Sequence, residues 1–159
     1  MNQSNLSKWL KFITILVGIM GAIVFFIILP QIGNELAITN KEFAFCYWPW
    51  LVFIWVMAIP CYLVLVLFWK ICREIENDNS FSKKNAILLG WISRLAIIDT
   101  IICFIGNIVF FFLGMSHPSV VIGFLFVIFA GIAIAVVSAA LAHLVEKASR
   151  IQEENDLTI

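Results

Sequence analysis

Long apolar stretches alternate with short polar segments along this chain. The apolar stretches predict helical spans over about residues 10–31, 48–70, 86–113 and 119–143. Each is close to the roughly 20 residues that a helix needs to cross the hydrocarbon core of a bilayer. Hydrocarbon offers the backbone no hydrogen-bond partner, and a helix satisfies its own amides and carbonyls. The pattern therefore predicts an all-α fold, an antiparallel four-helix bundle integral to a membrane.

The polar segments predict the connections and a tail. Gly114 and Pro118 in "GMSHPS" predict a tight turn between the third and fourth spans. Residues 1–159 form one membrane domain, with a tail over 144–159. Glu146 and Arg150 are four residues apart in the favourable order, so the fourth helix is expected to extend past the membrane.

Composition supports the membrane assignment. The chain is 63% hydrophobic and 13% charged, whereas soluble domains average about 45–50% apolar and about 25% charged residues. The mean hydropathy is +1.05. The formal net charge is zero, so no direct binding of nucleic acid is expected.

The distribution of Lys and Arg predicts the direction of the spans. Basic residues are enriched in cytoplasmic segments, and eight of the ten lie on one predicted face. Both termini are therefore expected inside, in the cytoplasmic membrane of a bacterium. Tryptophans favour the headgroup level, and only Trp55 lies off that pattern. The eight basic residues are Lys8, Lys11, Lys70, Arg73, Lys83, Lys84, Lys147 and Arg150.

Two ionisable residues lie within the third predicted helix. Arg94 is one turn beyond Trp91, about 4–5 Å deeper, and its side chain is long enough to return its charge to the headgroups. The favoured interpretation of Arg94 is an anchor in the inner leaflet, and a functional role is the alternative. Asp99 is deeper and too short to do the same. At mid-membrane it costs about 2.5–3.5 kcal/mol.

Small and polar residues predict how the last two spans pack. Small residues let membrane helices approach closely, and a matching stripe on span four predicts that spans three and four form a tight pair. Asp99 then faces the bundle, either as a structural residue or in an ion, proton or ligand role. Asn107 and Ser138 are further intramembrane polar candidates. The stripe on span three contains Ala96, Asp99, Cys103 and Gly106, and that on span four contains Gly131, Ala135, Ser138, Ala139 and Ala142.

No arrangement of residues indicates catalysis or metal binding. The two histidines, His117 and His143, lie at opposite boundaries, and the four cysteines are scattered. Metal sites need convergent ligands, and the phosphate-, dinucleotide- and zinc-binding motifs are absent from the sequence. We expect no catalytic residues, no metal, no cofactor and no enzymatic activity.

Two cytoplasmic segments are the most distinctive. The inner loop, residues 71–85, carries an acidic part followed by Lys83 and Lys84. The tail, residues 144–159, carries three acidic residues that are candidates for binding a partner: Glu153, Glu154 and Asp156.

The stretches "DNSFSKKNAILLGWI" and "ENDLTI" resemble an uncharacterised family of small bacterial four-span proteins, domain of unknown function 2975. The resemblance covers nearly the whole chain in span number and loop lengths. It implies no activity and no catalytic residues. It does imply a small helix-turn-helix regulator as a partner, because members are often encoded beside one.

These observations favour a small multi-pass membrane protein of regulatory or accessory type. It would bind a cytoplasmic partner, such as a helix-turn-helix regulator, through the inner loop and the tail. One alternative is a subunit of a transport or export system, or an ion or proton pathway, that uses Asp99. Another is immunity against a membrane-active peptide, through the outer loop. Besides the lipid bilayer as surroundings, self-association into a homo-oligomer is left open.

Overall fold

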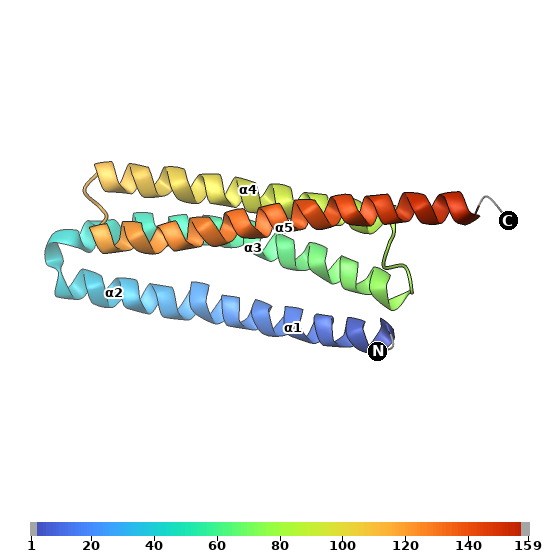
Figure 1. Ribbon diagram of the computed structural model, residues 1–159. Coiled ribbons are helices and arrows are strands. Elements are labelled where there is room, and N and C mark those ends of the chain that lie inside the picture. Colours follow the sequence, from blue (N-terminus) through green and yellow to red (C-terminus); the bar gives the residue numbers. More distant parts are fainter. Residues whose placement is uncertain (1–2, 157–159) are drawn as a thin grey trace.

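The structure is a computed structural model that describes residues 3–156, and these residues are almost entirely helical (Figure 1). The prediction of an all-α protein with four helical rods long and apolar enough to cross a membrane is confirmed. The elements are α1 (Gln3–Ile23), the π-helical turn η1 (Val24–Ile28), α2 (Leu29–Thr39), the 3₁₀ segment η2 (Lys41–Cys46), α3 (Tyr47–Glu76), α4 (Lys83–Phe112) and α5 (Pro118–Asp156).

The first rod is one helix, Gln3–Thr39, with a widened turn at η1. Pro30 follows that turn directly. A proline inside a helix has no N–H and crowds the carbonyl of the residue four positions earlier, and widened turns are one way in which helices relieve such crowding. Within η1, the carbonyl of Phe25 accepts a hydrogen bond from Nε1 of Trp55 at 3.2 Å. This bond accounts for the tryptophan that lies off the headgroup pattern.

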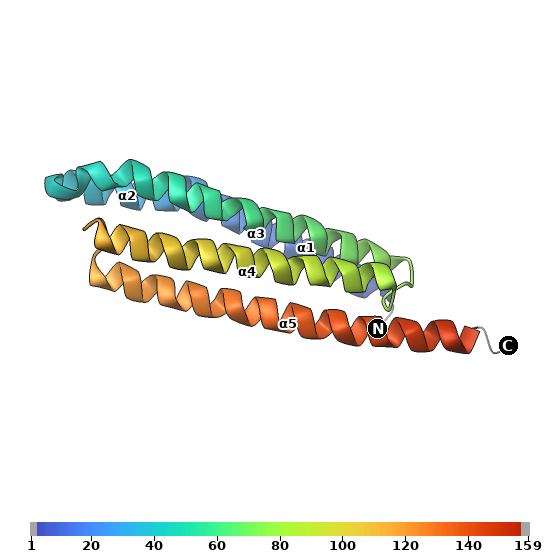
Figure 2. The ribbon, with the colours of Figure 1, turned by 90° about the horizontal axis from the view of Figure 1, so that it is seen from above.

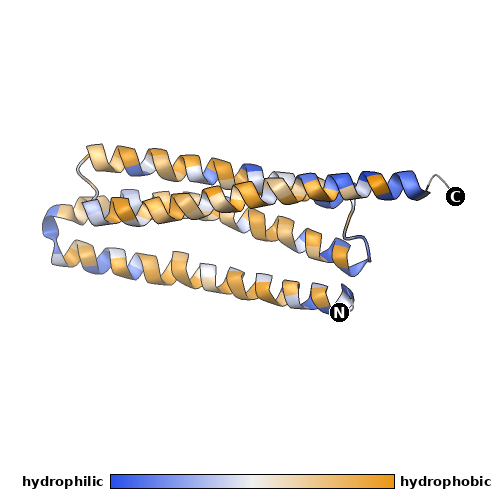
Figure 3. Ribbon diagram, in the orientation of Figure 1, coloured by the Kyte–Doolittle hydropathy of each residue, from blue (hydrophilic) through white to orange (hydrophobic). Residues whose placement is uncertain are grey.

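The four rods pack on one another in the order α1, α3, α4, α5. Seen from above, α3 overlaps α1, and α4 and α5 follow beside them (Figure 2). The α4–α5 pair has the most extensive contact, as the sequence predicts, followed by α3–α4 and α1–α3. Among residues 3–156, the backbone of α1 approaches neither α4 nor α5 closely. The two outer rods are the most hydrophobic and the least buried, because they face lipid over most of their surface. Polar residues gather at the ends of the rods (Figure 3).

Aromatic rings fill the space where α3, α4 and α5 meet. The ring of Trp50 lies 4.4 Å from that of Phe110 and 5.3 Å from that of Phe124, measured between centroids. Phe53 packs edge-on against Phe110, with centroids 5.3 Å apart. Gly106 of α4 lets Phe53 come this close, because a Cβ there would lie 2.3 Å from the ring. The aromatic cluster therefore depends on a glycine in the middle of α4.

The turns after α3 and after α4 close with the same backbone hydrogen-bond motif. After α3, the amide of Asn79 donates to the carbonyl of Glu74, and after α4 that of Met115 donates to Phe110. These six-to-one bonds belong to the Schellman motif, which needs a left-handed residue just past the helix. Gly114 supplies it with φ 69°, and Asp78 does so with φ 61° despite its side chain. On the other side of the first turn, Ser82 caps α4 by accepting from the amide of Asn85.

The substitution Gly106→Ala tests the aromatic cluster. The added methyl has to displace the Phe53 ring, which its neighbours hold, and overpacking of this kind costs about 1–3 kcal/mol. The thermal unfolding midpoint in detergent, followed by circular dichroism, should therefore fall.

The matched control is Gly123→Ala on α5, where an added Cβ meets nothing within 4 Å. Alanine is the better helix former by up to about 1 kcal/mol, so this midpoint should stay equal or rise. Equal midpoints for the two variants would contradict the tight approach at Gly106.

Candidate functional site

Asp99, the acid in the middle of α4, faces α3. Its Oδ2 accepts a hydrogen bond from Sγ of Cys61 at 3.5 Å. Its Oδ1 is buried and has no hydrogen-bond partner in the part of the chain that the structure describes. No ion pair within residues 3–156 includes Asp99. The acid thus has one weak donor from the neighbouring helix, and the pairing with α5 that the sequence suggested is not what the structure shows.

Arg94 is separate from Asp99 in space as well as in sequence. Its guanidinium lies over the ring of Trp91, 5.1 Å from the ring centroid. Both side chains are exposed on the outside of α4. A stacked cation of this kind is typical of the boundary between hydrocarbon and headgroups. Arg94 is therefore available to a ligand at that boundary and does not neutralise Asp99.

A second stripe on α4, which the sequence analysis missed, makes the contact with α5. Ser93 donates to the carbonyl of Ala135 at 2.8 Å, and Asn107 donates to that of Val121 at 3.4 Å. Between them, Thr100 lies against Gly131, where a Cβ would be 2.3 Å from its Oγ1. These residues recur every seven positions, which is the spacing of a left-handed helix pair. That spacing was the signal that could have found them.

The small residues proposed from the sequence therefore divide between two interfaces. Gly106 meets α3 through Phe53, and Gly131 meets α4 through Thr100. Ala135 and Ser138 are buried, whereas Ala139 is exposed beside them. Asp99 and Gly106 belong to the face of α4 that meets α3, about a quarter turn from the seven-residue stripe. The polar residues of α4 consequently hold two neighbours rather than one.

The inner loop is held by ion pairs and buried amides. Nζ of Lys84 lies 2.6 Å from Oε1 of Glu74, joining α4 to α3. Lys11 of α1 pairs with Glu76 of α3. The Lys84 hydrogen bond lowers the pKa of Glu74, and the Lys11 hydrogen bond lowers the pKa of Glu76. The side chain of Asn85 is buried and donates to two loop carbonyls, those of Asn79 and Ser80.

The tail begins as a continuation of α5. Arg150 lies 2.7 Å from Glu146, the i,i+4 pair that the sequence suggested. Glu153 and Glu154 are exposed on the last turns of the helix. Asp156 is the last residue of α5. The closing residues 157–159 of "ENDLTI" lie outside the described residues.

No group of three or more His, Cys, Asp or Glu side chains within residues 3–156 has the arrangement to hold a metal ion. The four cysteines, Cys46, Cys61, Cys72 and Cys103, are all free thiols. One of these thiols, that of Cys61, donates to the carboxyl group of Asp99 at membrane depth.

Comparison with known proteins now decides the family. Residues 31–159 match the family described as "Protein of unknown function (DUF2975)". The chain belongs to that family. It is 29% identical over 153 residues to "Uncharacterized membrane protein YoaS" of Bacillus subtilis (strain 168), covering 95% of this chain and 96% of that protein. No solved structure matches the chain. The resemblance carried by the inner loop and the tail is confirmed, and the chain is a membrane protein.

The substitution Asp99→Asn tests whether the acid supports the fold through its charge. The amide keeps the size of the side chain and can still accept from Cys61, while it removes the cost of an ionisable group in hydrocarbon, about 2.5–3.5 kcal/mol when charged. The thermal midpoint in detergent and the yield in membranes should be unchanged or higher. Asp99→Leu is the control for loss of the polar contact. A clearly lower midpoint for Asp99→Asn alone would show that the charge is required.

The Glu74–Lys84 pair predicts a pH dependence. The pKa of Glu74 is lower in the folded state than in the unfolded state, where a glutamate pKa is about 4.3. The pair therefore adds its full stability at pH values above the unfolded pKa, and this stability is lost as the pH falls through the folded pKa. Glu74→Gln should cost about 0.2–1 kcal/mol at pH 7, as exposed pairs do, and progressively less below about pH 4.

Denaturant titrations in detergent at pH 7 and pH 3.5 measure this difference. The control is the same substitution in a Lys84→Met background, where the cost at pH 7 should be absent. A cost that persists there, or that does not change with pH, would contradict the ion pair.

Proposed function

We propose that the protein is an accessory or regulatory component of the bacterial cytoplasmic membrane that binds a cytoplasmic protein through the free end of α5. The proposal is of binding rather than of catalysis. Both termini lie on the cytoplasmic side in this proposal, because the end of the bundle that holds them carries eight of the ten basic residues. The four rods and the family membership support the membrane location.

The observation that carries the proposal is the length of α5. The helix has 39 residues, about 58 Å at 1.5 Å per residue, whereas the hydrocarbon core is roughly 30 Å thick. Its last turns extend past the loop between α3 and α4 and past the N-terminal end of α1 (Figures 1 and 2). The end of α5 is packed as far as Ser149, which is buried, and residues 150–155 beyond it are exposed. Exposed helical turns in water are marginal by themselves. A projecting end of this kind is suited to docking with a partner.

The side chains on the projecting end fit a partner with an apolar groove and basic surroundings. Leu144 and Ile151, seven residues apart, are 61% and 51% exposed. Such a stripe is the usual recognition feature when a helix binds in a groove. Glu153 and Glu154 lie beyond it and present an acidic tip. An acidic tip complements a basic surface such as that of a DNA-binding protein.

The inner loop would contribute mainly its shape. Glu74 forms an ion pair with Lys84, and Glu76 forms one with Lys11. The side chain of Asn85 holds the loop backbone through two hydrogen bonds. The loop therefore offers a rigid platform beside α5. A small helix-turn-helix regulator, the partner class that the family resemblance implies, would be withdrawn from DNA while its basic surface is engaged.

Site-specific cross-linking tests the partner. A photoreactive residue at position 151, in cells at native expression, should give an adduct with a cytoplasmic protein that contains a DNA-binding helix-turn-helix. The adduct should decrease strongly with Glu153→Gln plus Glu154→Gln, because the acidic tip is neutralised. The matched control is the same photoreactive residue at position 122, an exposed apolar position at the opposite end of α5. Adducts of equal yield at both positions, or none at 151, would contradict the proposal.

The direction of the spans has its own test. A fluorescent or enzymatic reporter fused after Ile159 should be active only in its cytoplasmic form. A reporter after residue 40, in the predicted outer loop, should be active only in its periplasmic form. The reverse pattern would place the projecting end of α5 outside and exclude a cytoplasmic partner.

A further inference from the structure

A long groove runs between α4 and α5, and its walls come from these two helices alone. One section is almost entirely apolar and has a volume of about 540 Å³. The other section, toward the end of the bundle that holds the termini, is half polar and has a volume of about 490 Å³. Ser93 and Ala139 line both sections. The two sections therefore adjoin each other between the same two helices, and we name them together the α4–α5 groove.

The apolar section has the length of one leaflet. On α4 it extends from Ser93 to Phe104, a rise of about 16 Å along the helix. Half of the roughly 30 Å hydrocarbon core is about 15 Å. Ile97 and Ile101 on α4 and Val136 on α5 line it, and these side chains are about half exposed. The section is thus an open apolar channel that begins at the headgroup boundary and runs to mid-membrane.

The polar section offers cations at the mouth of that channel. Lys83 and Arg94 line it from α4, and His143 lines it from α5. Trp91, under the Arg94 guanidinium, marks the headgroup level. Gly90 lies between the two cations along the helix, and a Cβ there would meet nothing within 4 Å. The absence of a side chain at Gly90 leaves room for a bulky headgroup.

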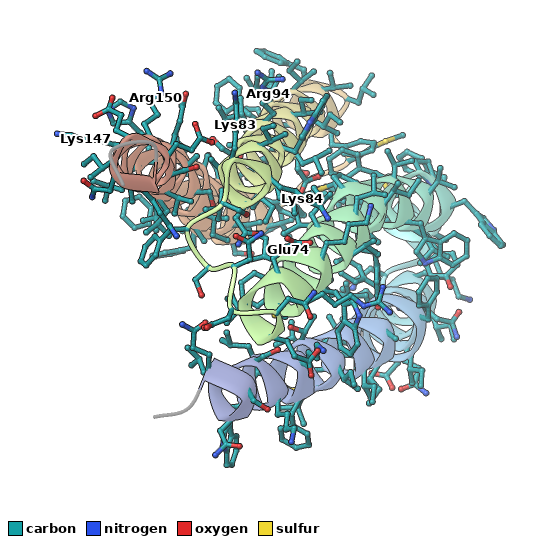
Figure 4. The ribbon with its side chains drawn as sticks, turned by 90° about the vertical axis from the view of Figure 1, so that its right-hand side faces the viewer. Glu74, Lys83, Lys84, Arg94, Lys147 and Arg150 are labelled. Carbon is teal, nitrogen blue, oxygen red and sulfur yellow. The ribbon has the colours of Figure 1, made fainter. Side chains whose placement is uncertain are left out.

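The charges around the polar section favour an anion. Glu146 is the one acid that lines it, and Arg150 holds that carboxylate at 2.7 Å. Lys84 is turned toward Glu74 on the α3 side, whereas Lys83 and Arg94 lie on the side of α4 away from Glu74 (Figure 4). Within residues 3–156, no ion pair includes either of these two cations. The section therefore carries uncompensated positive charge.

We propose that the α4–α5 groove is a binding site for one anionic phospholipid. The phosphate lies between Lys83 and Arg94, with His143 at the rim, and one acyl chain occupies the apolar section. Basic pockets between membrane helices bind anionic headgroups, and here the pocket continues into a channel of one chain's length. A zwitterionic lipid would need an acid for its ammonium group, and the carboxylate of Glu146 is already engaged.

Lipid binding by the detergent-solubilised full-length chain tests the proposal, measured by native mass spectrometry. Phosphatidylglycerol and phosphatidylcholine with identical acyl chains are titrated in parallel. Phosphatidylglycerol should bind at least tenfold more tightly. Lys83→Gln and Arg94→Gln should each weaken phosphatidylglycerol binding about fivefold, the equivalent of about 1 kcal/mol per cation, and should leave phosphatidylcholine unchanged.

The matched control is Lys147→Gln, which removes a cation at the same end of the bundle but outside the groove (Figure 4). Its effect on either lipid should be under twofold. Gly90→Leu fills the polar section without a clash at the Cβ, so it should abolish the preference for phosphatidylglycerol while the thermal midpoint stays equal or rises.

Three results would overturn the proposal. Equal binding of the two lipids would show only non-specific annular lipid. An equal loss in Lys147→Gln and Arg94→Gln would show a diffuse field rather than a site. Full competition by soluble glycerol phosphate at the lipid's own concentration would show that the apolar section contributes nothing.

Discussion

Hydrocarbon supplies no hydrogen-bond partners, and this constraint shapes every contact between the helices. Most of the side-chain hydrogen bonds between neighbouring rods follow one pattern, in which a side chain donates to a backbone carbonyl of the adjacent rod. Tyr62 donates to Gly18, and Ser93 donates to Ala135. In the turn after α4, the carbonyl of Met115 accepts from Trp50 of α3. A carbonyl that already serves its own helix keeps a second lone pair, so these bonds join the rods without breaking any helix.

The same constraint explains why different faces of α4 carry different polar residues. This helix packs on both α3 and α5 and has to satisfy two neighbours. One stripe on α4, with a spacing of seven residues, meets α5 and consists of Ser93, Thr100 and Asn107. Asp99 and Gly106 lie on another face and meet α3. The remaining side of α4 is left for Arg94 and the groove. One helix therefore combines two packing faces with a third that faces the lipid.

Three features could be predicted because each depends on local sequence: the four rods, the turn at Gly114 and the extension of α5. The pairing of faces could not, because two small-residue stripes on α4 lie a quarter turn apart and either could meet α5. Only the three-dimensional arrangement selects between them. The widened turn before Pro30 was also missed, since a proline near a predicted span end suggests a boundary rather than a continuing helix. The role of Trp55 depended on that turn.

Within residues 3–156, α3 is the long helix that packs on α1, and this has a consequence for biogenesis. The first rod leaves the ribosome before α3 has been made, so it enters the bilayer without a neighbour from this chain. The high hydropathy of the first rod is compatible with lipid on all sides at this stage. Each later rod can pack on the rod made just before it as soon as the hairpin between the two closes. Assembly in the order of synthesis would thus join α3 to α1 first, then α4 to α3, and finally α5 to α4.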